Sequence, residues 1–131
     1  MPATGQKSAY QSAQTSTVKI LYGESDEQTL STQCGAMAKA GHHVTTAHNR
    51  QGVLEALRGG AFDLVILGAT LSKDDRHHLP YMVKKADAAT KVLVMHAGTH
   101  HHEVDAAVDP TMSMHRILEK IAALLQSAPA R

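Results

Sequence analysis

Short apolar runs alternate along the chain with longer segments in which apolar residues recur every three or four positions. The apolar runs predict five strands, at residues 18–22, 43–47, 64–67, 91–95 and 105–108. The run at 64–67 contains only aliphatic residues, which is typical of a strand buried on both faces of a parallel sheet. Because strands and helices alternate, the pattern predicts an α/β domain with right-handed crossovers and helices on both faces of the sheet.

The first two predicted helices have start and stop signals. Ser25 and Gln28 have the spacing of a capping box, and Gly41 is placed to end that helix in the left-handed conformation. Asn49 is the predicted N-cap of the second helix, which ends at the pair Gly59-Gly60.

The last two predicted helices are marked by proline. Pro80 is assigned to the first turn of the third helix, and Asp109 and Pro110 to the N-cap and first position of the fourth. The sheet-facing sides of the four helices are predicted to be Leu30, Cys34, Met37 and Ala38; Val53, Leu54 and Leu57; Leu79, Met82, Val83 and Ala86; and Met114, Ile117, Leu118, Ile121 and Leu124.

Length and composition fit one folded domain. The 131 residues, of which 43% are hydrophobic and 19% charged, are enough for a single packed core and leave no room for a second. Residues 1–17 are rich in Ser, Gln, Thr and Ala without an apolar period, so we expect a disordered tail there. The expected domain is 18–126, and 127–131 is a short C-terminal tail.

Charge and cysteine content exclude several classes of function. Thirteen Lys and Arg against twelve Asp and Glu give a net charge of +1, which is too small for direct binding to nucleic acid. The chain has no apolar run long enough to span a membrane and no signal-peptide pattern, so we expect a cytoplasmic protein. The lone cysteine, Cys34, lies on an apolar helical stripe and is expected to be a buried thiol rather than a nucleophile.

Three segments resemble a known family. Residues 19–26, 62–67 and 92–95 are similar in pattern, order and spacing to the first, third and fourth strand regions of bacterial response-regulator receiver domains, the CheY-like superfamily. The resemblance covers roughly Val18 to Leu125 and implies a flavodoxin-like three-layer α/β/α sandwich with a five-stranded parallel sheet of order 2-1-3-4-5. Since few residues separate Met95 from Asp105, the helix that receivers carry there should be missing or very short.

The resemblance also implies where phosphorylation chemistry should lie. Receivers accept a phosphoryl group on an aspartate after the third strand, with Mg²⁺ held by an acidic pair after the first. Here Gly68 stands at the acceptor position and Glu24-Ser25 at the acidic pair, with Asp26 beside it. Such a remnant should bind Mg²⁺ weakly, because this ion needs near-octahedral oxygen ligands.

Two further receiver positions also differ. His96 stands where the family has Ser or Thr after the fourth strand, and Asp109 replaces the lysine that precedes a proline after the fifth. The four departures predict a non-enzymatic pseudo-receiver that needs no cofactor. It would signal independently of phosphorylation, by contact with a protein partner such as a sensor kinase or an output protein, and a homodimer is possible.

Histidine enrichment provides an alternative. Ten histidines include the clusters 42–43, 77–78 and 100–102, and several follow predicted strands at the carboxyl edge of the sheet, where open α/β folds bind ligands. His96, His100 and His102 are the candidate ligands for zinc, copper or nickel in a small-ligand or metal-binding domain. We favour a solvated polar loop, because adjacent histidines cannot easily all point at one ion.

Overall fold

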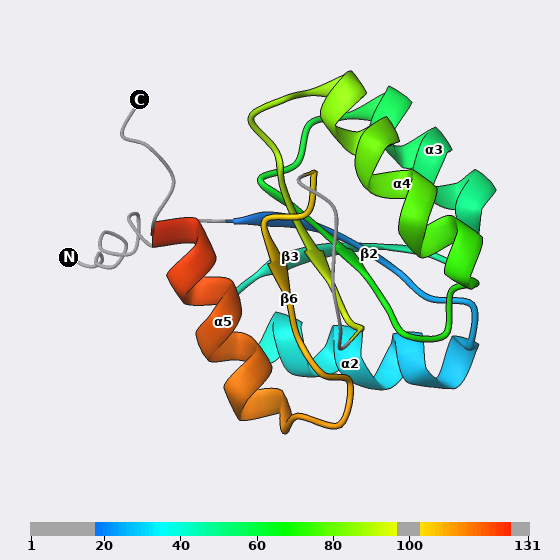
Figure 1. The fold of residues 1–131 in the computed structure, drawn as a ribbon. Helices are drawn as coiled ribbons and strands as arrows, with labels where there is room; N and C mark the ends of the chain where they lie inside the picture. The colour runs from blue at the N-terminus through cyan, green and yellow to red at the C-terminus, as the bar shows by residue number, and fades with distance from the viewer. Residues whose placement is uncertain (1–17, 97–102, 127–131) are drawn as a thin grey trace, which may run out of the picture.

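The computed structural model describes residues 18–96 and 103–126 (Figure 1). The predicted tails, 1–17 and 127–131, lie outside the described residues. The elements in chain order are β2 (Lys19–Gly23), α2 (Glu27–Lys39), β3 (His43–Ala47), α3 (Arg50–Gly59), β4 (Leu64–Leu67), α4 (Lys73–Ala86), β5 (Lys91–Val94), β6 (Ala106–Ala107) and α5 (Met114–Gln126).

The five strands form one parallel sheet in the order β3-β2-β4-β5-β6. In strand numbers counted from the first strand, this is the predicted order 2-1-3-4-5. The register pairs Gly23 with Leu67 and Leu67 with Val94, so the carboxyl ends of the three central strands are level. The loops that follow these strands therefore meet at one edge of the sheet.

Helices cover both faces of the sheet, with α2 and α5 on one side and α3 and α4 on the other (Figure 1). Side chains along each central strand alternate between the two cores, as a strand period of two requires. On β2, Ile20 and Tyr22 face α2 and α5, whereas Leu21 faces α3 and α4. The predicted flavodoxin-like three-layer sandwich is confirmed.

The edge strand β6 is only two residues long and is supported by Asp105. The Asp105 carboxylate accepts a hydrogen bond from the backbone N–H of Val92 and pairs with Lys84 of α4, each at 2.8 Å. The receiver helix before this strand was predicted to be missing or very short, and residues 97–102 of that segment lie outside the described ranges. The described residues between β5 and β6 contain no helix, and the described part of the chain has none that is long and apolar enough to cross a membrane.

Several local predictions are confirmed. The predicted strands 43–47 and 64–67 match β3 and β4. Asn49 caps α3 by accepting from the backbone N–H of Gly52, and α3 ends at Gly59. Gly41 follows α2 with a φ of 101°, which favours glycine in the position predicted to end that helix.

The predicted capping box at Ser25 is wrong. Asp26 is the N-cap of α2, and its carboxylate accepts from both the backbone N–H and the hydroxyl of Thr29. These two bonds lower the pKa of the exposed Asp26 carboxyl. Either residue can cap a helix in principle, and a carboxylate also interacts favourably with the helix dipole.

The starts of the last two helices also differ from the predictions. Ser72 caps α4 through the backbone N–H of Asp75, so Pro80 lies well inside the helix rather than in its first turn. Asp109 instead caps a turn by accepting from Thr111, while the Ser113 hydroxyl accepts from the backbone N–H of Arg116 at the start of α5. Prolines here mark neither helix start.

On α2 and α4, four side chains predicted to face the core are less buried than expected. Cys34 and Met82 are half-buried, and Ala38 and Ala86 are exposed. The apolar stripes of α2 and α4 are wider than the surface that the sheet and neighbouring helices cover.

Candidate functional site

Glu24 and Gly68 lie next to each other at the carboxyl edge of the sheet. They follow Gly23 and Leu67, which are paired in register on the adjacent parallel strands β2 and β4. The alternation of side chains directs both positions toward the α2 and α5 side, the side of Tyr22 and Ile66. Strand alternation and the register between β2 and β4 together direct the Glu24 side chain toward the position that in receivers carries the acceptor aspartate.

The Glu24 carboxylate fills the space that a side chain at Gly68 would need. A Cβ built on Gly68 would lie 1.8 Å from Glu24 Cδ and 2.1 Å from each carboxylate oxygen. Such distances are far inside van der Waals contact. This position of Glu24 therefore requires glycine at residue 68.

Glu24 is only 1% exposed, and three hydrogen-bond donors hold its buried carboxylate. The Tyr22 hydroxyl donates to Oε2, and Thr70 donates to Oε1 through its backbone N–H at 2.9 Å and its hydroxyl at 2.5 Å. In the described part of the chain, none of the ion pairs includes Glu24. Neutral donors thus offset the cost of burying this carboxyl group.

Thr70 links the loop after β4 to the loop after β2. Its Oγ1 donates to Glu24 and accepts from the backbone N–H groups of Ser25 at 2.8 Å and Asp26 at 3.0 Å. Two loops that are more than forty residues apart in sequence are thereby tied to one side chain. These hydrogen bonds connect the two loops at the carboxyl edge of the sheet.

Tyr22 is the third residue of the cluster and lies in the core on the α2 and α5 side of the sheet. It is fully buried, and its Oη also lies 3.0 Å from the Gln33 side-chain oxygen on α2. Burial raises the pKa of the Tyr22 phenol well above its usual range, and the hydrogen bond to Glu24 raises it further. Tyr22 therefore acts as a neutral hydrogen-bond donor rather than as an acid.

The other positions named from the sequence contribute no side chain to this cluster. Ser25 and His96 are exposed, and Asp26 is committed to capping α2. Asp109 is exposed, and hydrogen bonds from Thr111 lower the pKa of its carboxyl. Of these positions, only Glu24 and Gly68 are brought together.

The residues do not fit the Mg²⁺ ion that receivers use. Both oxygens of Glu24 already accept hydrogen bonds, and the nearest second carboxylate in sequence, Asp26, is held by Thr29. Mg²⁺ would need to displace these donors and then find further oxygen ligands. The described residues contain no group of three His, Cys, Asp or Glu side chains suited to a metal.

The histidine clusters are only partly described. His77 and His78 lie on α4 rather than on a loop, and His78 stacks on Tyr81 and lies 2.7 Å from Arg50. His100 and His102 lie outside the described residues, so a metal site formed by them with His96 stays a prediction.

The fold of this chain is similar to solved structures of response-regulator proteins. A two-component response regulator from Clostridium difficile superposes with a TM-score of 0.75 at 16% identity, over 87% of this chain and all of that one. A CheY-like receiver domain protein from Methanospirillum hungatei JF-1 gives 0.76 at 18%, over 86% and 97% of the two chains. This chain has the receiver-domain fold.

A third solved structure gives the same fold at similarly low sequence identity. A response regulator from Thermotoga maritima, solved in complex with Mg²⁺ and BeF, matches with a TM-score of 0.72 at 19% identity, over 82% of this chain and 99% of that one. No protein-family model and no curated protein sequence matches this chain. At such identities the receiver fold is shared, whereas the site must be argued from its own residues.

Sequence reasoning missed two members of the cluster. Tyr22 was assigned to the first strand as an ordinary core residue, and Thr70 was not singled out. One signal was present for Tyr22: a buried phenol requires a hydrogen-bond partner, and Glu24 lies two residues away on the same face of the strand.

Proposed function

We propose that this chain is a receiver-fold signalling domain that works without aspartyl phosphorylation. The observation that carries the proposal is the Glu24 carboxylate in the space beside Gly68. A receiver would place its acceptor side chain there, and here that volume holds a carboxylate whose oxygens are already bonded. Glu24, Ser25, Gly68, His96 and Asp109 are then the remnants of a phosphorylation site.

The domain would act through contact with a protein partner, either a sensor kinase or an output protein. Residues 18–126 form the proposed signalling unit, with a tail on each side. The tie from Glu24 through Thr70 to the loop after β2 supports a fixed conformation, because it uses groups of this chain alone. The domain would thus present one constant surface in place of a switched one.

The test is incubation with a small-molecule phosphodonor and Mg²⁺, followed by intact mass measurement. We expect no acid-labile acyl phosphate on the wild-type chain. A receiver with an acceptor aspartate serves as the positive control for the donor. Stoichiometric labelling of any carboxylate in this chain would overturn the proposal.

A matched variant makes the negative result informative. Gly68→Asp combined with Glu24→Asp, Ser25→Asp and Asp109→Lys restores the carboxylates and the lysine that the receiver resemblance implies. Labelling of this variant, alongside an unlabelled wild type, would assign the loss of chemistry to these positions.

A further inference from the structure

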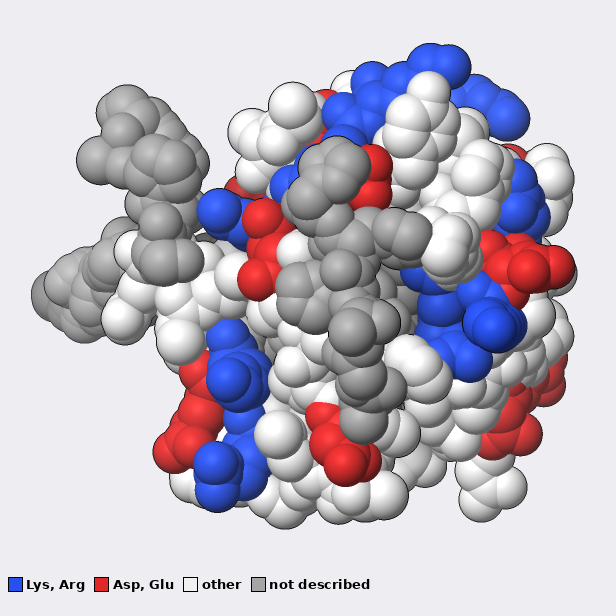
Figure 2. Space-filling model, in the orientation of Figure 1, with Lys and Arg blue, Asp and Glu red and all other residues white. Residues whose placement is uncertain are grey.

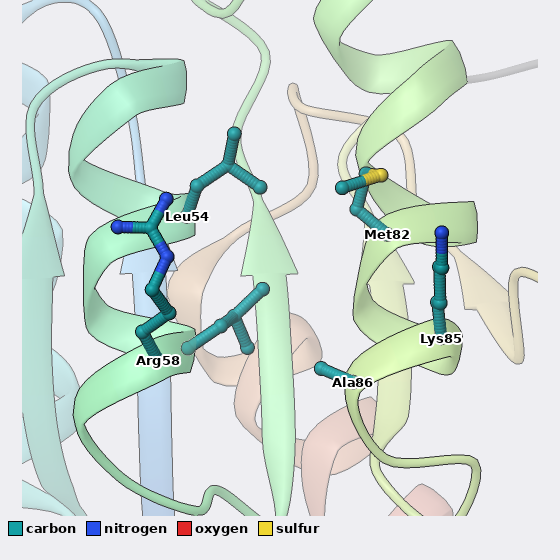
Figure 3. Close-up of a pocket in the computed structure, with 6 residues that line it drawn as sticks. Leu54, Arg58, Met82, Lys85 and Ala86 are labelled. Carbon is teal, nitrogen blue, oxygen red and sulfur yellow. The ribbon is translucent and has the colours of Figure 1, made fainter.

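A surface groove of about 340 Å³ lies between α3 and α4, away from the carboxyl edge of the sheet. It is lined by Leu54, Leu57, Arg58, Met82, Lys85 and Ala86. Figure 3 shows Leu54, Met82 and Ala86 directed toward the space between the two helices, with Arg58 and Lys85 on its two flanks. The groove has an apolar floor and a basic rim.

The floor is apolar surface that the fold leaves uncovered. Leu54, Leu57 and Met82 belong to the sheet-facing stripes of their helices but are only half-buried. On both helices the apolar residues thus extend beyond the surface that is buried in the core. Covering such surface with another apolar surface is favourable.

The two basic residues of the rim, Arg58 and Lys85, form no ion pair with an acidic side chain in the described structure. Both lie in the last turn of their helices, where a positive charge suits the helix dipole. That role is shared by Lys84, which is paired with Asp105. No ion pair among the described residues includes Arg58 or Lys85.

The neighbouring acids have other partners. Glu55, beside Leu54 on α3, accepts from the Gln51 amide, and Asp87, at the end of α4, accepts from the backbone N–H of Ala89. Lys and Arg side chains gather over the upper ends of α3 and α4 in Figure 2. The electrostatic potential at the groove is therefore positive, although the net charge of the chain is only +1.

Tyr81 extends the apolar surface along α4. It is half exposed, at 50%, and is the exposed large hydrophobic residue of the described structure. It stacks on His78 and stands one turn before Lys85 on the same helix. Tyrosine and arginine are the residue types enriched at the energetic centres of protein interfaces.

We infer that this groove binds an amphipathic helix of a partner protein, with an apolar face flanked by acidic residues; this rests on the proposed signalling function. A helix lying between α3 and α4 would place apolar side chains at spacings of three and four residues over Leu54 and Met82. Its acidic residues would meet Arg58 and Lys85. The volume lies at the low end of small-molecule sites, and two cations are too few for nucleic acid.

The test uses a designed helical peptide with leucines at positions i, i+3, i+4 and i+7 and glutamates beside them. Its charge-reversed twin, with lysines in place of the glutamates, is the control peptide. Fluorescence anisotropy should show binding of the acidic peptide alone, weakening as salt is raised. Methyl NMR shifts should map to Leu54, Leu57 and Met82.

Charge reversal at the rim distinguishes this groove from general attraction. Arg58→Glu with Lys85→Glu should weaken peptide binding by about tenfold or more. Lys39→Glu with Lys120→Glu changes the net charge equally at exposed positions on α2 and α5, and should leave binding nearly unchanged.

Four results would overturn the inference. They are equal binding of the basic peptide, no binding of the acidic peptide at millimolar concentration, tight binding of laurate instead of the peptide, or a dimer that the rim variant dissociates. None of them bears on acyl-phosphate labelling, so this inference and the proposed function can fail separately.

Discussion

The carboxylate of Glu24 stands where the side chain of residue 68 would begin, and only glycine at 68 permits it. The two residues directly follow Gly23 and Leu67, which are paired in register on adjacent parallel strands, and they lie on the same side of the sheet. Receivers place an acceptor carboxylate at this position on the second of these strands. Here a carboxylate from the first strand takes the same volume and is hydrogen-bonded within the fold.

Gly68→Ala should destabilise the domain by about 2 kcal/mol, because displacing Glu24 breaks the hydrogen bonds that its buried carboxylate accepts from Tyr22 and Thr70. Gly68 has no left-handed φ, so backbone strain does not contribute. In a Glu24→Ala background the same change should become neutral or stabilise by about 0.5 kcal/mol. Urea unfolding of the four chains in a double-mutant cycle measures this coupling.

Gly35→Ala is the control for that cycle, because a Cβ there meets nothing within 4 Å. It should stabilise α2 slightly in both backgrounds. Additive effects of the changes at residues 24 and 68 would contradict the coupling between the Glu24 carboxylate and the glycine at 68.

Stability should fall at alkaline pH through Tyr22. Its pKa in the folded state is raised above the unfolded value near 10, so above about pH 10 the unfolded chain releases this proton first. The free energy of unfolding then decreases by up to about 1.4 kcal/mol per pH unit, whereas below pH 10 this contribution is constant. Denaturant titrations at several pH values measure this dependence. Tyr22→Phe should abolish its part of the decrease in unfolding free energy above pH 10, whereas the control Tyr81→Phe, at an exposed position, should retain it.

Asp26, not Ser25, should control the start of α2. Asp26→Ala should lower the midpoint of urea unfolding, whereas Ser25→Ala should not, because only the Asp26 side chain caps the helix. The pKa of Asp26 is lowered in the folded state, so its contribution is present above about pH 4 and is lost as the pH falls through the folded value. The difference in urea midpoint between wild type and Asp26→Ala should therefore shrink in acid. An equal effect of Ser25→Ala would instead support the capping-box interpretation.

Millimolar Mg²⁺ should leave the melting temperature unchanged, and removal of metal with a chelator should do the same. A ligand that binds only the folded state raises stability in proportion to the logarithm of its concentration over its dissociation constant. Glu24 is engaged with Tyr22 and Thr70 and Asp26 with Thr29, so no acidic pair is available. A concentration-dependent rise in melting temperature, absent with Na⁺ at equal ionic strength, would show that the pair still binds the ion.

The sequence by itself determined the order of elements, the central strands and the glycine at residue 68, because these follow from local hydrophobic period and residue identity. Helix starts were decided by competition between neighbouring residues, such as Ser25 and Asp26, whose outcome depends on the path of the chain into the helix. The position of Glu24 was decided by tertiary structure alone. It depends on the register between β2 and β4 and on donors from Tyr22 and Thr70, and residues so far apart in sequence meet only when the sheet forms.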